Sequence, residues 1–231
     1  MKLILNFEMT HKIKGSEKMI YLVGGAPLNE NWLKSLEDRN ILWVGVDGGT
    51  MALLDAGFHV THAFGDFDSV SKEEFNKISS VVESVHTAIP EKNETDMEMA
   101  LNWAIQQNQS VRIIGATGGR LDHFMGNVQL ISSPHVMDHS FEVEIFDEQN
   151  RIRMLSAGKW ETSNDESFPY LSFIPVTPEV KGLTLKGVKY PLYDHDLTFG
   201  STLTVSNEFI EAIASISFRT GILMMIRSKD K

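Results

Sequence analysis

The first half of the chain alternates short apolar runs with segments whose apolar residues repeat at helical spacing. The apolar runs predict buried strands at 20–23, 41–46, 62–64 and 111–114. The helical segments are expected to begin near Asn29, Met51, Ser71, Thr95 and Leu121. Strands that alternate with helices predict an α/β domain with a mostly parallel sheet, covered by helices on both faces.

The pattern changes near Pro134, after which no helical stripe is evident. Short strands separated by turn residues are expected at 141–146, 151–155, 170–174, 180–185, 202–205, 212–218 and 222–226. This spacing predicts an all-β antiparallel domain, a sandwich or a partial barrel, of which we favour the sandwich. We therefore expect an N-terminal extension or tag at 1–18, an α/β domain at 19–135 and a β-sandwich domain at 140–231.

Composition narrows the chemistry that the chain can perform. The 231 residues include no cysteine, which excludes disulfides, thiolate metal sites and a cysteine nucleophile. A bound metal would need oxygen or imidazole ligands, and oxygen ligands favour hard ions such as Mg²⁺. The net charge of −10 argues against nucleic acid as a partner. The absence of a long apolar run argues against a membrane span, so a cytoplasmic location is expected.

Four glycine-rich segments directly follow predicted strands. They are Gly24-Gly25, Asp47-Gly48-Gly49, Gly65-Asp66-Phe67-Asp68 and Gly115-Ala116-Thr117-Gly118-Gly119-Arg120. Ligands of open parallel sheets bind at the carboxyl ends of the strands. Glycine there lets backbone N–H groups approach phosphate oxygens closely. We therefore expect a nucleotide or another phosphate-bearing ligand, although neither a Walker A loop nor a G-x-G-x-x-G motif is present.

Asp66 and Asp68 are the sharpest chemical feature of the sequence. If the segment is extended, residues two apart point to the same side, so both carboxylates face one cavity and Phe67 faces the core. Two neighbouring carboxylates repel each other unless a proton or a cation lies between them, and Mg²⁺ bound to phosphates is a natural cation. The alternative is a pair of turn-forming aspartates leading to the next helix.

Other polar residues near these loops admit two interpretations each. Asp96 either joins the metal site or complements the dipole of its helix. Asp122 is a candidate for the same pocket or a plain N-cap. Arg120 offers the planar fork that phosphate oxygens prefer. Lys92 either contacts phosphate or is a solvated surface lysine.

The order of these motifs resembles the thiamine pyrophosphokinase family. The matching segments are Asp47-Gly48-Gly49, 65–69, Lys92 to Asp96, 115–123, 187–192 and Ser206-Asn207-Glu208. One departure is Asn93, where the family usually has aspartate. The resemblance begins near Met19 and therefore leaves residues 1–18 outside it.

The resemblance implies an enzyme that transfers a diphosphoryl group from ATP to the hydroxyl of thiamine, giving thiamine diphosphate and AMP. It implies that the first domain binds ATP and that the sandwich helps to bind thiamine. It also implies a homodimer whose active sites are shared between chains.

Particular residues take roles under this resemblance. Asp66, Asp68 and Asp96 would hold Mg²⁺. ATP would be bound by Asp47, Gly48, Gly49, Lys92 and the loop Thr117-Gly118-Gly119-Arg120. Asp122 would orient the alcohol or the thiamine ring. Tyr190 would stack on thiamine, and Ser206 and Asn207 would bind its aminopyrimidine. Without the resemblance, Tyr190 is interpreted as a half-buried strand residue, and Ser206 and Asn207 as part of a turn.

Two other functions remain open at this level. One is an ATP-dependent phosphotransferase that acts on another heterocyclic alcohol. The other is a non-catalytic sensor of thiamine or nucleotide, against which the set of acidic residues argues.

Overall fold

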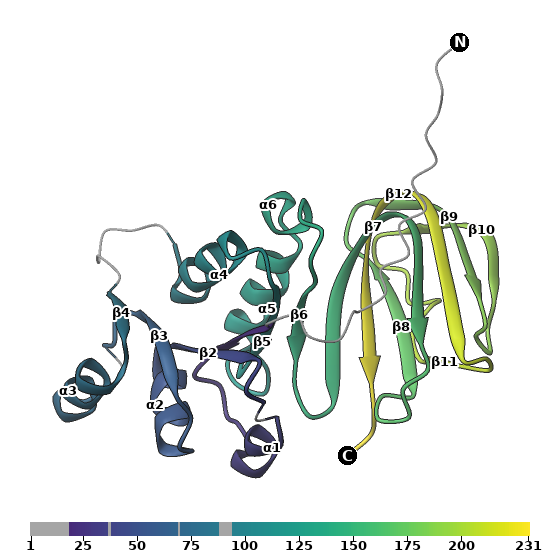
Figure 1. Ribbon diagram of the computed structural model, residues 1–231. Coiled ribbons are helices and arrows are strands. Elements are labelled where there is room, and N and C mark those ends of the chain that lie inside the picture. Colours follow the sequence, from purple (N-terminus) through teal and green to yellow (C-terminus); the bar gives the residue numbers. More distant parts are fainter. Residues whose placement is uncertain (1–18, 37, 69, 88–93) are drawn as a thin grey trace.

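The computed structural model describes residues 19–36, 38–68, 70–87 and 94–231. The expected extension at 1–18, Lys92 and Asn93 lie outside the described residues. Figure 1 shows a lobe of strands and helices beside a lobe made of strands alone. The fold therefore has the predicted class, an α/β half followed by antiparallel strands. No helix among the described residues is long and apolar enough to cross a membrane.

The first lobe is a parallel sheet in the order β6-β5-β1-β2-β3-β4. Its strands are β1 (Met19–Val23), β2 (Ile41–Val46), β3 (Val60–Gly65), β4 (Ser84–Thr87), β5 (Ser110–Ile114) and β6 (Val143–Phe146). Its helices are α1 (Glu30–Ser35), α2 (Gly48–Asp55), α3 (Lys72–Val81), α4 (Asp96–Gln106), α5 (Leu121–Ile131) and α6 (Pro134–Met137). The short polar strand β4 is an addition to the predicted set.

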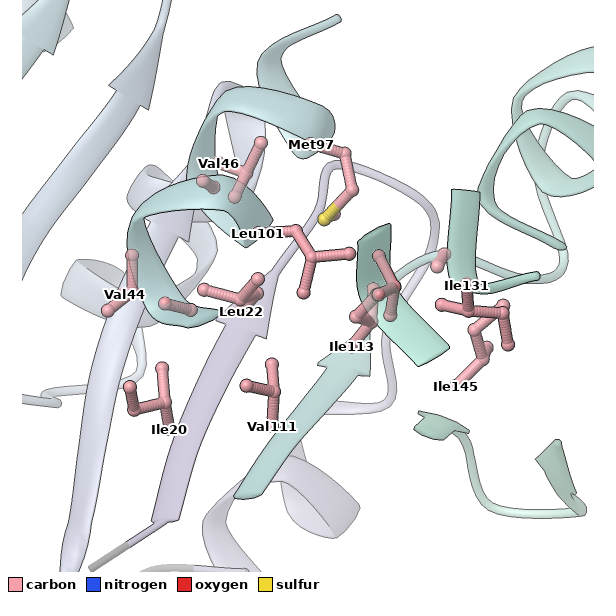
Figure 2. Close-up of a cluster of buried hydrophobic side chains, with 14 of the residues drawn as sticks. Ile20, Leu22, Val44, Val46, Met97, Leu101, Val111, Ile113, Ile131 and Ile145 are labelled. Atoms are coloured by element: carbon pink, nitrogen blue, oxygen red, sulfur yellow. The ribbon is translucent and has the colours of Figure 1, made fainter. Parts of the chain in front are cut away.

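Alternating side chains of the strands fill two separate cores, one on each face of the sheet. Ile20 and Leu22 of β1 pack with Leu101 of α4 and Ile131 of α5 (Figure 2). Tyr21 and Val23 of the same strand point the other way and pack with residues of α1, α2 and α3. The period of two along each strand therefore explains why helices cover both faces.

Helix starts agree with the capping signals of the sequence. Ser71 and Glu74 form a complete capping box before α3. The Thr95 hydroxyl accepts a hydrogen bond from the backbone N–H of Glu98, which fixes the start of α4. As a result, Asp96 is the first residue of α4, at the carboxyl edge of the sheet.

The division between the halves differs from the predicted one. The expected strand 141–146 corresponds to β6, which pairs in parallel with β5 and belongs to the first sheet. The chain then turns at Asp147 and returns as β7 (Asn150–Ser163), which is antiparallel to β6. The change from parallel to antiparallel pairing thus follows Phe146, because a β-rich sequence alone does not reveal pairing direction.

The second lobe is antiparallel, as predicted, but two of its strands are much longer than expected, and one has only two residues. They are β7, β8 (Tyr170–Pro175), β9 (Glu179–Lys186), β10 (Leu192–Thr198), β11 (Asn207–Glu208) and β12 (Ile213–Ser228). The predicted strands 212–218 and 222–226 are one strand with an irregular register between Phe218 and Ile222. Residues 202–205 form turns rather than a strand, and the polar strand β10 was not predicted.

A buried ion cluster joins the two lobes. Glu144 of β6 is 2% exposed and accepts hydrogen bonds from Arg112 of β5 at 2.5 Å and Arg151 of β7 at 3.0 Å. Arg112 also donates to the hydroxyl of Tyr21. Because one carboxylate holds side chains of both lobes, the junction is a fixed part of the fold.

Candidate active site

The four predicted glycine loops meet at one edge of the first sheet. β5, β1, β2 and β3 are consecutive neighbours, and all of them are parallel, so their carboxyl ends lie together. Backbone hydrogen bonds tie the loops: Ala26 N–H donates to Gly115 O at 3.0 Å, and Asp47 N–H donates to Phe64 O at 2.7 Å. The structure thus brings together the loops in which the sequence predicts the chemistry.

Two glycines of these loops are required for different reasons. A Cβ on Gly49 would lie 1.9 Å from the carbonyl oxygen of Val23, so this glycine is fixed by close backbone packing. Gly118 has a φ of 74°, in the left-handed region that favours glycine, and a Cβ there would have nothing within 4 Å. The loop at Gly118 is therefore open, as a loop that receives a ligand must be, whereas Gly49 serves the fold.

Asp66 and Asp68 lie on a tight turn after β3 rather than on the extended segment that we expected. Phe67 has a φ of 56°, and its side chain is buried against Phe75. The Asp66 carboxylate accepts the backbone N–H of Asp68 at 3.0 Å. The segment therefore forms a turn, a geometry that leaves both carboxylates exposed and free to bind a metal, and Phe67 reaches the core as predicted.

Four carboxylates interact across this edge. The negative charge of Asp66 is the main cause that raises the pKa of Asp68, and Asp47 adds to it. Burial raises the pKa of Asp96, and the charges of Asp66, Asp47 and Asp68 raise it further. These carboxylates, which lie directly after β2, after β3 and at the start of α4, therefore repel one another and favour a cation between them.

The carboxylate oxygens at this edge suit a hard cation whose remaining ligands are water and substrate phosphates. In the described ranges, no group of three or more histidine, aspartate or glutamate side chains is assembled to hold a metal by itself. Mg²⁺ is usually bound through one or two carboxylates together with water and substrate phosphates. Asp66, Asp68 and Asp96 offer such oxygen atoms, so the residues present fit Mg²⁺ that arrives with a phosphate ligand.

Arg120 and Asp122 bind each other at the start of α5. The guanidinium of Arg120 donates to both carboxylate oxygens of Asp122, at 3.1 and 2.5 Å. This contact lowers the pKa of Asp122 to about 2, and both side chains are exposed. Asp122 is the second residue of α5 and not its N-cap, and its low pKa makes it a poor proton acceptor at neutral pH.

Tyr190 lies in the second lobe, between β9 and β10, and is 60% exposed. Asn207 is buried; its side-chain oxygen accepts Tyr190 N–H at 3.0 Å and its NH₂ group donates to Tyr190 O at 2.9 Å. Ser206 is exposed, and its N–H donates to the Ser172 hydroxyl. Asn207 thus supports the backbone of Tyr190, so its amide does not reach outward as the sequence suggested.

The fold and this edge define a class of protein, an α/β phosphotransferase with an added β domain. Comparisons with known proteins give the family. Residues 33–145 match the model of "Thiamin pyrophosphokinase, catalytic domain", and residues 161–223 match "Thiamin pyrophosphokinase, vitamin B1 binding domain". The chain therefore belongs to the thiamin pyrophosphokinase family, as its motifs predicted.

Individual relatives agree with this assignment. Thiamine pyrophosphokinase of Bacillus subtilis is 43% identical over 215 residues, which cover 92% of this chain and 100% of the relative. The crystal structure of thiamin pyrophosphokinase from Geobacillus thermodenitrificans has 44% identity and a TM-score of 0.83, covering 92% and 98% of the two chains. The yeast enzyme, at 13% identity and a TM-score of 0.75 over 94% and 88%, shares the fold.

Proposed function

We propose that the chain catalyses transfer of a diphosphoryl group from ATP to the hydroxyl of thiamine, releasing AMP. The observation that carries this proposal is the gathering of Asp47, Asp66, Asp68 and Asp96 at the same edge of the sheet as the open loop 117–120. Family membership and the high identity to a thiamine pyrophosphokinase support it. The thiamine oxygen attacks the β-phosphorus, the bond between that phosphorus and the oxygen of the α-phosphate breaks so that AMP leaves, and the hydroxyl proton is released to solvent.

Asp66, Asp68 and Asp96 are the proposed ligands of Mg²⁺. Bound there with ATP, the ion would neutralise charge on the phosphate oxygens and so lower the barrier to attack. The mutual repulsion of the carboxylates supports this role, because a cation relieves it. Asp47, at the start of α2, adds to the negative field that attracts the ion.

The open loop Thr117-Gly118-Gly119-Arg120 is the proposed contact for the triphosphate, together with Gly48 and Gly49. Arg120 donates to Asp122 through Nε and one terminal nitrogen, so its other terminal nitrogen is the proposed donor to a phosphate oxygen. Because Asp122 is exposed and ionised, its proposed role is to hold Arg120 and to orient the alcohol rather than to take up its proton. Lys92 remains a predicted phosphate contact outside the described residues.

Thiamine is proposed to bind against Tyr190, whose ring suits the positive charge of the thiazolium. Ser206, which is exposed beside buried Asn207, is a candidate contact for the aminopyrimidine. The second lobe also exposes the large side chains of Tyr193 (70%), Phe199 (71%) and Ile210 (66%), which a partner chain could cover. We therefore keep the predicted homodimer with shared sites as part of the proposal; the cytoplasmic location stays a prediction.

Phosphorus NMR of ATP, Mg²⁺ and thiamine with the purified protein tests the proposal. Signals of AMP and thiamine diphosphate are the expected products. Formation of ADP would instead indicate simple kinase chemistry on this or another alcohol. Binding of thiamine and ATP without turnover would indicate a sensor, and either result would contradict the proposed reaction.

A further inference from the structure

A hollow of about 250 Å³ lies at the carboxyl edge of the sheet, on the side of β5 and β6. Three segments line it: 27–29 together with Trp32 from the start of α1, Thr117 and Gly118 after β5, and the turn 147–150 after β6. The hollow therefore shares Thr117 and Gly118 with the loop to which the triphosphate is assigned.

Hydrogen bonds hold these segments in place around the hollow. The amide of Asn29 donates to Glu148 Oε1 at 3.0 Å, across the gap between α1 and the turn that joins β6 to β7 (Figure 1). The Thr117 hydroxyl donates to Asp147 Oδ2 at 2.6 Å. Trp32 packs on Phe146, with ring centroids 5.3 Å apart. The hollow is thus a built part of the fold, in which each lining segment contacts another.

The lining offers a flat apolar wall and one available amide. Trp32 and Pro27 supply the wall, and the amides of Asn29 and Asn150 already hydrogen-bond to Glu148 and Asp147. Within the described part of the chain, no hydrogen bond or ion pair engages the side-chain amide of Gln149. An aromatic face with a nearby group that both donates and accepts suits a neutral nitrogen heterocycle.

Size and position indicate which part of a substrate binds here. The volume is below the roughly 300–1,000 Å³ of pockets that enclose a whole drug-sized ligand, so only part of ATP would fit. From β5, whose loop lines the hollow, to β3 the edge crosses three strand spacings, about 14 Å, which the ribose and the triphosphate together can bridge to reach Asp66 and Asp68. All the lining residues lie outside 161–223, the stretch that matches the vitamin B1 binding domain.

We propose that this hollow binds the adenosine end of ATP, with Trp32 stacking on the base and Gln149 hydrogen-bonding to its edge. The inference rests on the proposed function, because that function makes ATP the substrate. It assigns nucleotide selection to the start of α1 and to the turn after β6. The phosphates then run along the glycine loops toward the carboxylates that follow β3 and begin α4.

Calorimetric titration of the full chain with AMP and with ribose 5-phosphate, which lacks the base, tests this assignment. The wild-type chain should bind AMP more tightly than ribose 5-phosphate. Trp32→Ala should weaken AMP binding about tenfold and leave ribose 5-phosphate binding unchanged, since base stacking on an aromatic ring is typically of this strength. Trp32→Phe, which keeps an aromatic ring against Phe146, should retain most of the preference for AMP.

Gln149→Ala should weaken AMP binding severalfold, and Gln129→Ala, an exposed glutamine on α5, serves as the matched control with no change. An unchanged preference for AMP in both Trp32→Ala and Gln149→Ala would overturn the assignment. So would an absence of AMP binding in the wild type, or a loss of thiamine binding in place of AMP binding. Because AMP binding needs no turnover, failure of the proposed reaction would be seen separately in the NMR assay.

Discussion

The two lobes of the molecule concentrate opposite kinds of surface. The first lobe places four mutually repelling carboxylates at the edge of a sheet whose two faces are buried under helices. The second lobe leaves Tyr190 and other large aromatic and aliphatic side chains exposed. The carboxylates of the first lobe favour a bound cation, and the apolar surface of the second lobe favours an apolar partner. Each lobe therefore carries part of what the transfer of a diphosphoryl group to thiamine requires.

The junction between the lobes shows how these parts keep a fixed geometry. β7 and β12 form one long antiparallel pair, and β7 also pairs with β6 of the first sheet. Glu144 anchors Arg112 and Arg151 at this point. The contrast between the lobes therefore concerns their surfaces, while the backbone forms one continuous sheet.

Removing one carboxylate of the first lobe should have the largest effect on activity. We expect Asp68→Asn to lower kcat roughly 100-fold or more with the fold intact, because metal-assisted charge neutralisation supplies several kcal/mol. Steady-state kinetics with circular dichroism would measure this. Asp138→Asn, an exposed aspartate after α6, is the control. Near wild-type kinetics for Asp68→Asn would remove the metal role from this residue.

Breaking the junction should have the largest effect on stability. Glu144→Gln should lower the free energy of unfolding by about 3 kcal/mol, because it leaves buried arginines without their counter-charge. Denaturant titration would show this loss. Glu30→Gln, which breaks the exposed Glu30–Lys34 pair, should change stability by less than about 0.5 kcal/mol. Equal effects of the two substitutions would contradict the role given to Glu144.

Changes in the second lobe should affect thiamine recognition more than the chemical step. Tyr190→Ala should raise KM for thiamine about tenfold, with a small change in kcat, because a stacked cation loses its aromatic face. If sites cross the dimer, purified mixed dimers of Asp68→Asn and Tyr190→Ala chains, assayed at a thiamine concentration well below the wild-type KM where both parents are weak, should show about half of wild-type activity from one intact site. Mixed dimers no more active than their parents would place each site within one chain.

The smallest predicted effect concerns the stability of the metal-free protein. The raised pKa of Asp96 means that folding favours its protonated form, so stability is lost as pH rises from the usual aspartate range through the raised pKa. At neutral pH, Asp96→Asn should therefore raise Tm by about 1–3 °C. At a pH well below the usual aspartate range, thermal melts of the two proteins should coincide. A lower Tm for the variant at neutral pH would show that Asp96 is not strained by its neighbours.

Much of this arrangement could be predicted from the sequence. Period-two strands, capping boxes and glycine loops gave the α/β class, the helix starts and the edge at which Asp66, Asp68 and Asp96 gather. Those signals are local, and parallel strands place their carboxyl ends together whatever the loop details. The motif order also gave the family, which the comparisons confirm.

Other features depend on contacts that no local pattern records. β6 has the same composition as an antiparallel strand, and only its pairing with β5 assigns it to the first sheet. Phe67 adopts a left-handed turn because its ring is buried, which alternation in an extended strand does not predict. Asn207 had the appearance of a polar turn residue, yet it is buried beneath Tyr190. Trp32 and Gln149 lie far apart in the chain and meet only through the turn after β6.

Binding of Mn²⁺ in the presence of ATP, measured by electron paramagnetic resonance, tests the central claim most directly. The wild-type chain should bind Mn²⁺ with ATP tightly, and Asp66→Asn combined with Asp68→Asn should abolish that binding at the same concentrations. Asp138→Asn should behave like the wild type. Equal Mn²⁺ binding by the wild type and the double variant would contradict the claim that these carboxylates hold the metal–triphosphate group.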